Sequence, residues 1–215
     1  AGIYNLTALG DQDIFVSKLD ASGNFLWAKQ MGGANTSFGD AGSAISVDAT
    51  GNIYTTGYFS GTSDFDPGPG VYTKTALNRR DAFVSKLDAG GNFLWVAQFG
   101  GTGFWQYDDM GYMIKTDASN NVYTIGYFNG TVDFDPGPGN YYLSSPNNLN
   151  HLFISKLDAF GNFVWATDFI LPNYLGNFTG YGFEVDNNLD LFITGYFLGT
   201  VDFDPGTAVY NMTAT

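Results

Sequence analysis

Short apolar runs separated by turn-forming residues recur along this chain. In its middle part they cover about residues 82–87, 92–98, 111–116 and 121–128, and they are rich in Phe, Tyr, Val and Thr. These residue types favour strands, whereas the Asp, Gly and Asn residues between the runs favour tight turns. The joint DAGGN at 88–92 is typical of a hairpin, because Asp caps a turn with its side chain and Gly or Asn accepts a positive φ. The pattern predicts a four-stranded antiparallel meander.

The second run is apolar on both faces. Phe93, Trp95 and Ala97 alternate there with Leu94 and Val96. A strand wetted on one side would carry a polar residue at every second position, so we expect this strand to be covered on both sides by stacked sheets. The side chains expected to be largely buried in this way are Phe25, Phe93, Phe163, Trp27, Trp95 and Trp165.

The whole pattern is repeated three times with a period of about 69 residues. The strings DIFVSKLD, DAFVSKLD and HLFISKLD begin at residues 13, 81 and 151, and DFDPG begins at residues 64, 133 and 202. A repeated four-stranded unit buried on both faces predicts an all-β, β-propeller-like fold of tandem blades. We place the end of a preceding repeat at 1–12 and the blades at 13–80, 81–150 and 151–215, the last of them incomplete.

The two ends of the chain stand at the same phase of the repeat, since GIYNLTAL at 2–9 aligns with AVYNMTAT at 208–215. A closed propeller needs about four to eight blades, which is more than three. We therefore expect further repeats of the same protein, or self-association with neighbouring copies.

Composition excludes several classes of function. The net charge is −13 with only eight Lys and Arg residues, so the basic surface that nucleic acid requires is missing. The chain has no Cys, which excludes disulfides, thiolate metal sites and Cys nucleophiles. No apolar run approaches about 18 residues, so we expect no membrane insertion.

The repeated strings resemble the bacterial β-propeller repeats often called SBBP repeats. The resemblance is carried by DAFVSKLDAGGNFLW at 81–95, by the Gly-Gly loops at 32–33 and 100–101, and by AISVDATGNIYTTGYF at 44–59. It implies a secreted or cell-surface protein without established catalytic residues. The third copy departs from the pattern, because His151 replaces the leading Asp and the Gly-Gly loop after Trp165 is lost.

The DFDPG segment is the most site-like feature of each repeat. Strand alternation puts its two carboxylates on one side, next to a Pro-Gly turn with free carbonyls, and such hard oxygen atoms suit Ca²⁺. The alternative is that each Asp caps the turn through backbone N–H groups, and it is slightly favoured because the segment matches no EF-hand or RTX loop. The candidate calcium ligands are Asp64, Asp66, Asp133, Asp135, Asp202 and Asp204.

Catalysis is not predicted. The Asp pairs have the spacing of a glycosidase acid–base couple, but three equivalent copies without a nearby Glu or His argue against a differentiated active site. His151 is the only His, so a zinc site or a catalytic triad lacks its partners, and we expect a surface substitution there. The nucleophile-elbow and P-loop patterns are absent.

The segment after each TGYF-type strand lengthens the unit beyond a four-stranded blade. Val71-Tyr72 and its counterparts suggest a short additional strand at the rim, where a repeat scaffold carries its contacts. Trp105 and Tyr107 lie in a Gly-rich loop found once, and we take them as candidate ligand contacts. Sequons for glycosylation occur at Asn5, Asn35, Asn129, Asn177 and Asn211.

These observations favour a non-catalytic extracellular structural or adhesive repeat module that polymerises into a surface fibre. The alternative is a propeller that binds glycans or proteins through its rim loops. A ligand specific to one loop would favour the second function, and regular packing between copies would favour the first.

Overall fold

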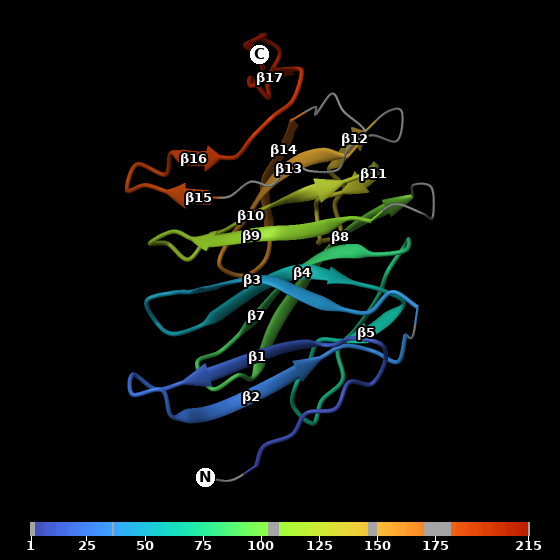
Figure 1. Cartoon of the computed structure of the whole chain (residues 1–215), viewed down its shortest axis with the longest axis vertical. Coiled ribbons are helices and arrows are strands. Elements are labelled where there is room, and N and C mark those ends of the chain that lie inside the picture. The colour runs from blue at the N-terminus through green and yellow to red at the C-terminus, as the bar shows by residue number, and fades with distance from the viewer. Residues whose placement is uncertain (1–2, 36, 103–107, 146–149, 170–181, 215) are drawn as a thin grey trace.

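The computed structural model describes residues 3–35, 37–102, 108–145, 150–169 and 182–214. Throughout these ranges the chain forms antiparallel strands and turns without any helix, and thus no helix that could cross a membrane. The all-β prediction is confirmed. Four sheets follow one another in chain order along the long axis of the molecule (Figure 1).

The first and fourth of these sheets have two strands each and the third has four, whereas the second has four long strands and is extended to six by a short hairpin that pairs with its last strand. The first sheet contains β1 (Ile14–Leu19) and β2 (Phe25–Met31). The second contains β3 (Ala41–Val47), β4 (Ile53–Phe59), β7 (Asp81–Leu87) and β8 (Phe93–Thr102). The third contains β9 (Met110–Thr116), β10 (Val122–Phe128), β13 (His151–Leu157) and β14 (Phe163–Phe169). The fourth contains β15 (Gly182–Val185) and β16 (Leu191–Thr194).

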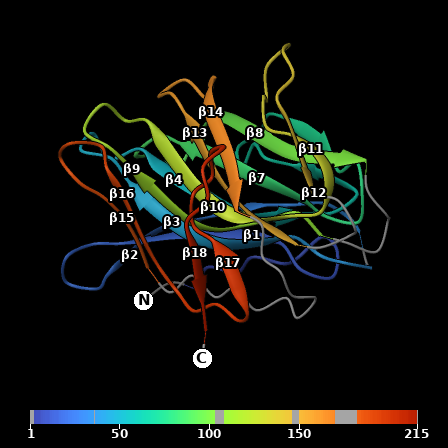
Figure 2. The same cartoon turned by 90° about the horizontal axis from the view of Figure 1, so that it is seen from above.

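A rim hairpin of two short strands follows β4, β10 and β16, instead of the single additional strand that we expected. The hairpins are β5 (Thr62–Asp64) with β6 (Thr73–Thr75), β11 (Gly130–Asp133) with β12 (Tyr142–Ser145), and β17 (Thr200–Asp202) with β18 (Asn211–Thr213). β11 also pairs with the end of β8, so this hairpin ties the third sheet to the second (Figure 2).

We expected the four strands of one repeat to form one sheet, and this expectation is wrong, because each four-stranded unit takes its strands from two successive repeats. β7 pairs with β4 from Ile53–Leu87 to Phe59–Asp81, and with β8 on its other side, whereas β8 and β9 lie in different sheets. Each complete sheet therefore joins the last two strands of one repeat to the first two of the next. The blade limits that we placed at 80/81 and 150/151 fall inside the second and third sheets. After the first rim hairpin the chain pairs again with the strand that precedes the hairpin, so that β7 lies beside β4. After β8 the chain instead continues in the next sheet with β9.

Three apolar clusters fill the spaces between successive sheets. The middle strands β4, β7, β10 and β13 are buried along nearly their whole length. The run that we expected to be covered on both sides is instead the outermost of the four long strands of its sheet, and its two faces are only partly covered. Leu94 and Phe25 are exposed, and Phe93, Phe163 and the repeated Trp side chains are half-buried. The prediction that the aromatic side chains of this run are largely buried is therefore wrong.

Candidate functional site

The DFDPG segments fold into the same turn in all three rim hairpins. Asp64 Oδ1 accepts hydrogen bonds from the backbone N–H groups of Asp66 (3.0 Å) and Tyr72 (2.8 Å), and Asp66 Oδ1 accepts one from Gly68 (2.8 Å). The Phe between the two Asp residues points into the core, where Phe65 is fully buried. The same hydrogen bonds are made by Asp133, Asp135, Asp202 and Asp204.

These contacts give the carboxylates a role as turn caps. Among the described residues no three His, Cys, Asp or Glu side chains gather as a metal-binding group. A Ca²⁺ ion at a DFDPG turn would need backbone carbonyls or water in addition to the two carboxylates. Calcium binding at the six Asp residues stays a prediction.

A second kind of Asp turn closes the hairpins of the sheets. Asp48 Oδ1 accepts from the N–H groups of Thr50 and Asn52 (both 2.9 Å) and from the Thr50 hydroxyl (2.7 Å). Its Oδ2 accepts from Asn52 Nδ2 (2.9 Å) and the Tyr54 hydroxyl (3.1 Å). Burial alone would raise the pKa of Asp48, but these hydrogen bonds outweigh it and lower the pKa to about 2. Equivalent caps are formed by Asp20, Asp88, Asp117, Asp158 and Asp186.

The Gly-Gly loops permit close contact between neighbouring sheets. A Cβ atom on Gly101 would overlap the carbonyl oxygen of Thr131 in β11, and one on Gly33 would overlap that of Thr62 in β5. A Cβ on Gly100 would collide with the carboxylate of Asp81. The loops are therefore required where a rim hairpin lies against the end of the preceding sheet. The repeated string identified these glycines, but only the fold shows which backbone they face.

His151 is buried, and the expectation of a surface substitution is wrong. Its Nδ1 lies 2.6 Å from Asp168 Oδ2. In the second sheet the equivalent pair is Gln98 and Asp81. Gln98 Nε2 donates a hydrogen bond to Asp81 Oδ2 at 2.6 Å. The third repeat has thus exchanged the positions of the nitrogen-bearing side chain and the carboxylate, which keeps a polar contact between a middle strand and the outer strand beside it. The substitution is therefore accounted for by packing within the sheet.

The surface on which successive sheets pack is itself repeated. Trp27 lies against Gly91, and Trp95 lies against Gly161, in the hairpin turn of the following sheet. Each contact is accompanied by a Lys at the same position of the preceding sheet: the Nζ atoms of Lys18 and Lys86 donate to the carbonyls of Ala89 (3.1 Å) and Ala159 (3.0 Å). The repeated Trp residues therefore serve packing between sheets, as their place in the strand predicted.

Other candidate residues have mixed outcomes. Trp105, Tyr107 and Asn177 lie outside the described residues. The Asn129 side chain is buried, which makes its sequon unavailable in the folded chain, whereas Asn5 and Asn211 are exposed and Asn35 is half-buried. Glycosylation at the three accessible positions stays a prediction.

Comparison with known proteins supports the repeat architecture and leaves the finer family open. No family model matches the chain, so membership of the SBBP-type family is not supported. An uncharacterized WD repeat-containing protein of Acanthamoeba polyphaga mimivirus is 28% identical over 182 residues, which cover 77% of this chain and 12% of that protein. WD repeats are a β-propeller type, and the four stacked antiparallel sheets agree with it. This chain is thus similar to a short stretch of a long propeller-type repeat protein.

Proposed function

We propose that the chain is a non-catalytic structural or adhesive module of a secreted or cell-surface repeat protein, and that it associates with further copies or repeats of itself. The observation that carries this proposal is the repetition of one packing surface. The same Trp-on-Gly and Lys-to-carbonyl contacts join the first sheet to the second and the second to the third. Because the same surface of each sheet packs against the next sheet, it could pack in the same way against a sheet of another copy, and this supports assembly.

The polar groups support the same conclusion, because they are used for structure. The carboxylates of the DFDPG turns and of the sheet hairpins accept backbone N–H groups in every described copy. An active site needs side chains whose environments differ, so that one group can act as acid and another as base. Equivalent copies with equivalent partners do not supply that difference.

Binding of another protein or a glycan through the rim hairpins is a second candidate function. The Tyr beside each DFDPG turn is exposed although it recurs in every hairpin, as Tyr72, Tyr141 and Tyr210, and its apolar neighbours Val71, Tyr142 and Val209 are exposed as well. Exposed aromatic and aliphatic side chains at repeated positions are suited to a partner surface. The likeness to a WD repeat-containing protein favours a protein partner over a glycan.

Location and binding can be tested separately. Antibodies against the chain should label intact source cells or particles, and brief external protease should remove the label; label that appears only after permeabilisation would contradict the extracellular role. The chain should also be screened against glycans and surface proteins. Binding that is lost in a Val71→Ser, Tyr142→Ser variant would favour the rim-binding function over the purely structural one.

A further inference from the structure

The first and fourth sheets are complementary halves of one complete sheet. β1 and β2 occupy the sequence positions of β7 and β8, whereas β15 and β16 occupy those of β3 and β4. In the second sheet these two halves meet where β4 pairs with β7. Among the described residues no strand pairs with the corresponding edge of β16 in the fourth sheet, or with that edge of β1 in the first sheet. The two half sheets lie at opposite ends of the molecule (Figure 1).

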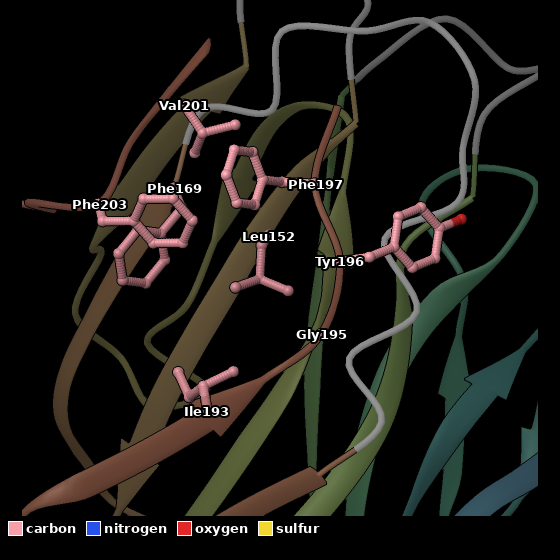
Figure 3. A pocket seen from close by; sticks show the side chains of 8 residues that line it. All are labelled: Leu152, Phe169, Ile193, Gly195, Tyr196, Phe197, Val201 and Phe203. Carbon is pink, nitrogen blue, oxygen red and sulfur yellow. The ribbon is translucent and has the colours of Figure 1, made fainter. Parts of the chain in front are cut away.

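A cavity marks the place of a missing side chain in the fourth sheet. In the third sheet Phe134 contacts the rings of Phe128 at 5.4 Å and Phe153 at 4.9 Å between centroids, in addition to Phe99 of the second sheet at 5.3 Å. In the fourth sheet Phe197 and Phe203 reproduce the first contact at 5.2 Å, but the third ring is missing from this group. A cavity of about 100 Å³ lies there instead, lined mainly by apolar side chains from the third and fourth sheets (Figure 3).

The residue equivalent to the missing Phe is Phe15, at the other end of the chain. Phe15 is 70% exposed, whereas its counterparts Phe83 and Phe153 are 0% exposed. The fourth sheet shows the matching exposure, because Phe192 is 59% exposed while its counterpart Tyr54 is 0% exposed. Both half sheets therefore present to solvent the side chains that a complete sheet buries.

We propose that β1 of a second copy pairs antiparallel with β16 and places its Phe15 in this cavity. The register follows from the complete sheets, in which Ile53 faces Leu87 and Gly57 faces Phe83. By the same register Leu191 faces Leu19 of the second copy, and Gly195 faces its Phe15. The proposal deepens the proposed function, since it rests on the self-association named there and assigns the strands that carry it.

Gly195 is suited to this contact. The equivalent Gly126 leaves room for the ring of Phe153, because a Cβ atom on Gly126 would lie 2.6 Å from the Cε1 atom of that ring. Gly195 lines the cavity between Ile193 and Tyr196 (Figure 3). A ring from a second copy would therefore meet backbone there, as Phe153 does in the third sheet.

Two further contacts would form at the same junction. Trp165 of the third sheet would lie against Gly23 of the second copy, as Trp95 lies against Gly161; Gly23 has no neighbour within 4 Å of a Cβ position in the single chain. Lys156 would donate to the carbonyl of Ala21, as Lys86 donates to that of Ala159. Backbone pairing, one buried ring, one Trp contact and one Lys contact thus all come from a single repeated geometry.

A second copy would also bring the number of sheets into the range of a closed propeller. The described residues form two complete sheets and two complementary halves. Two copies of these residues joined at both junctions would give six complete sheets, which lies within the range of about four to eight blades that closed propellers use. Head-to-tail contacts of this kind close when the rotation permits and otherwise continue into a chain of copies.

Native mass measurement tests the association. The wild-type chain should run at twice 23.3 kDa, or as a ladder of multiples if the ring stays open. Phe15→Asp should weaken association by about tenfold or more, while Leu94→Asp adds the same charge at an exposed position of β8, away from the junction, and should leave association unchanged. A wild-type monomer at all concentrations, or equal association of the two variants, would overturn the proposal. If the wild-type chain stays monomeric, a strand from outside residues 1–215 would be the better candidate occupant of the cavity.

Disulfide trapping tests the register, because the chain has no Cys. Thr55 faces Ser85 in the second sheet, so Ser17→Cys in one chain should cross-link to Ile193→Cys in another. Ser17→Cys mixed with Thr194→Cys is the matched control, because a shift by one residue moves the side chain to the opposite face. Equal cross-linking in both mixtures, or none in the first, would overturn the pairing. A surface-located monomer would refute the pairing alone, and an assembled intracellular chain would refute the extracellular role alone.

Discussion

Replacement of Asp48 by Asn should cost stability in a manner that depends on pH. Five hydrogen-bond donors converge on the Asp48 carboxylate, and they lower its pKa from 3.8 to about 2 although the group is buried. A change of that size corresponds to about 2 kcal/mol of folding free energy at neutral pH. Because the folded pKa lies below the unfolded one, this stabilisation is complete well above pH 3.8 and is lost as pH falls towards about 2.

Urea unfolding at a series of pH values measures this effect. Trp fluorescence follows the unfolding, and one contributor, Trp95, lies 6.1 Å from Tyr54 between ring centroids. Asp48→Asn should lower the free energy of unfolding by about 2 kcal/mol near pH 7, and the difference from wild type should shrink towards pH 2. Asp20→Asn is the matched control, since Asp20 caps the same kind of turn with only three such donors and its replacement should therefore cost less. A loss for Asp48→Asn that is equal at both pH values would refute the role of the charge.

Three other predictions concern the loops and the remaining carboxylates. Gly101→Ala should destabilise by about 2 kcal/mol or more, because the new methyl group overlaps the Thr131 carbonyl, whereas Gly42→Ala meets only ordinary contacts; thermal melting compares the two. Asp109→Asn should raise the free energy of unfolding near pH 7 and change little near pH 3, because burial raises the pKa of Asp109 and ionisation opposes folding as pH rises. If DFDPG binds Ca²⁺, chelator should lower the melting temperature of wild type, and by less in Asp66→Asn, which keeps two of the three turns; an unchanged wild-type midpoint would leave turn capping as the role of the segment.

The local elements were predictable because their causes are local. The repeat of about 69 residues, the strands around 82–87 and 121–128, and the Asp-capped turns all follow from residue type and short-range spacing. The same holds for the core position of Phe65 between two Asp residues, since alternation along a strand separates its faces. Candidate caps at the DFDPG turns were recognisable for the same reason, because each carboxylate reaches backbone N–H groups a few residues away.

Pairing between strands was decided only by the tertiary structure. Alternation along a strand is the same whichever neighbour it pairs with, so the pattern could not distinguish a meander within one repeat from a sheet shared by two repeats. The burial of His151 against Asp168, and the place of Gly101 beside Thr131, likewise depend on residues distant in the chain. The sequence by itself determined the unit and its turns. The packing of successive sheets determined which strands are inner or outer and where a complementary strand is missing, because those properties arise from contacts between repeats.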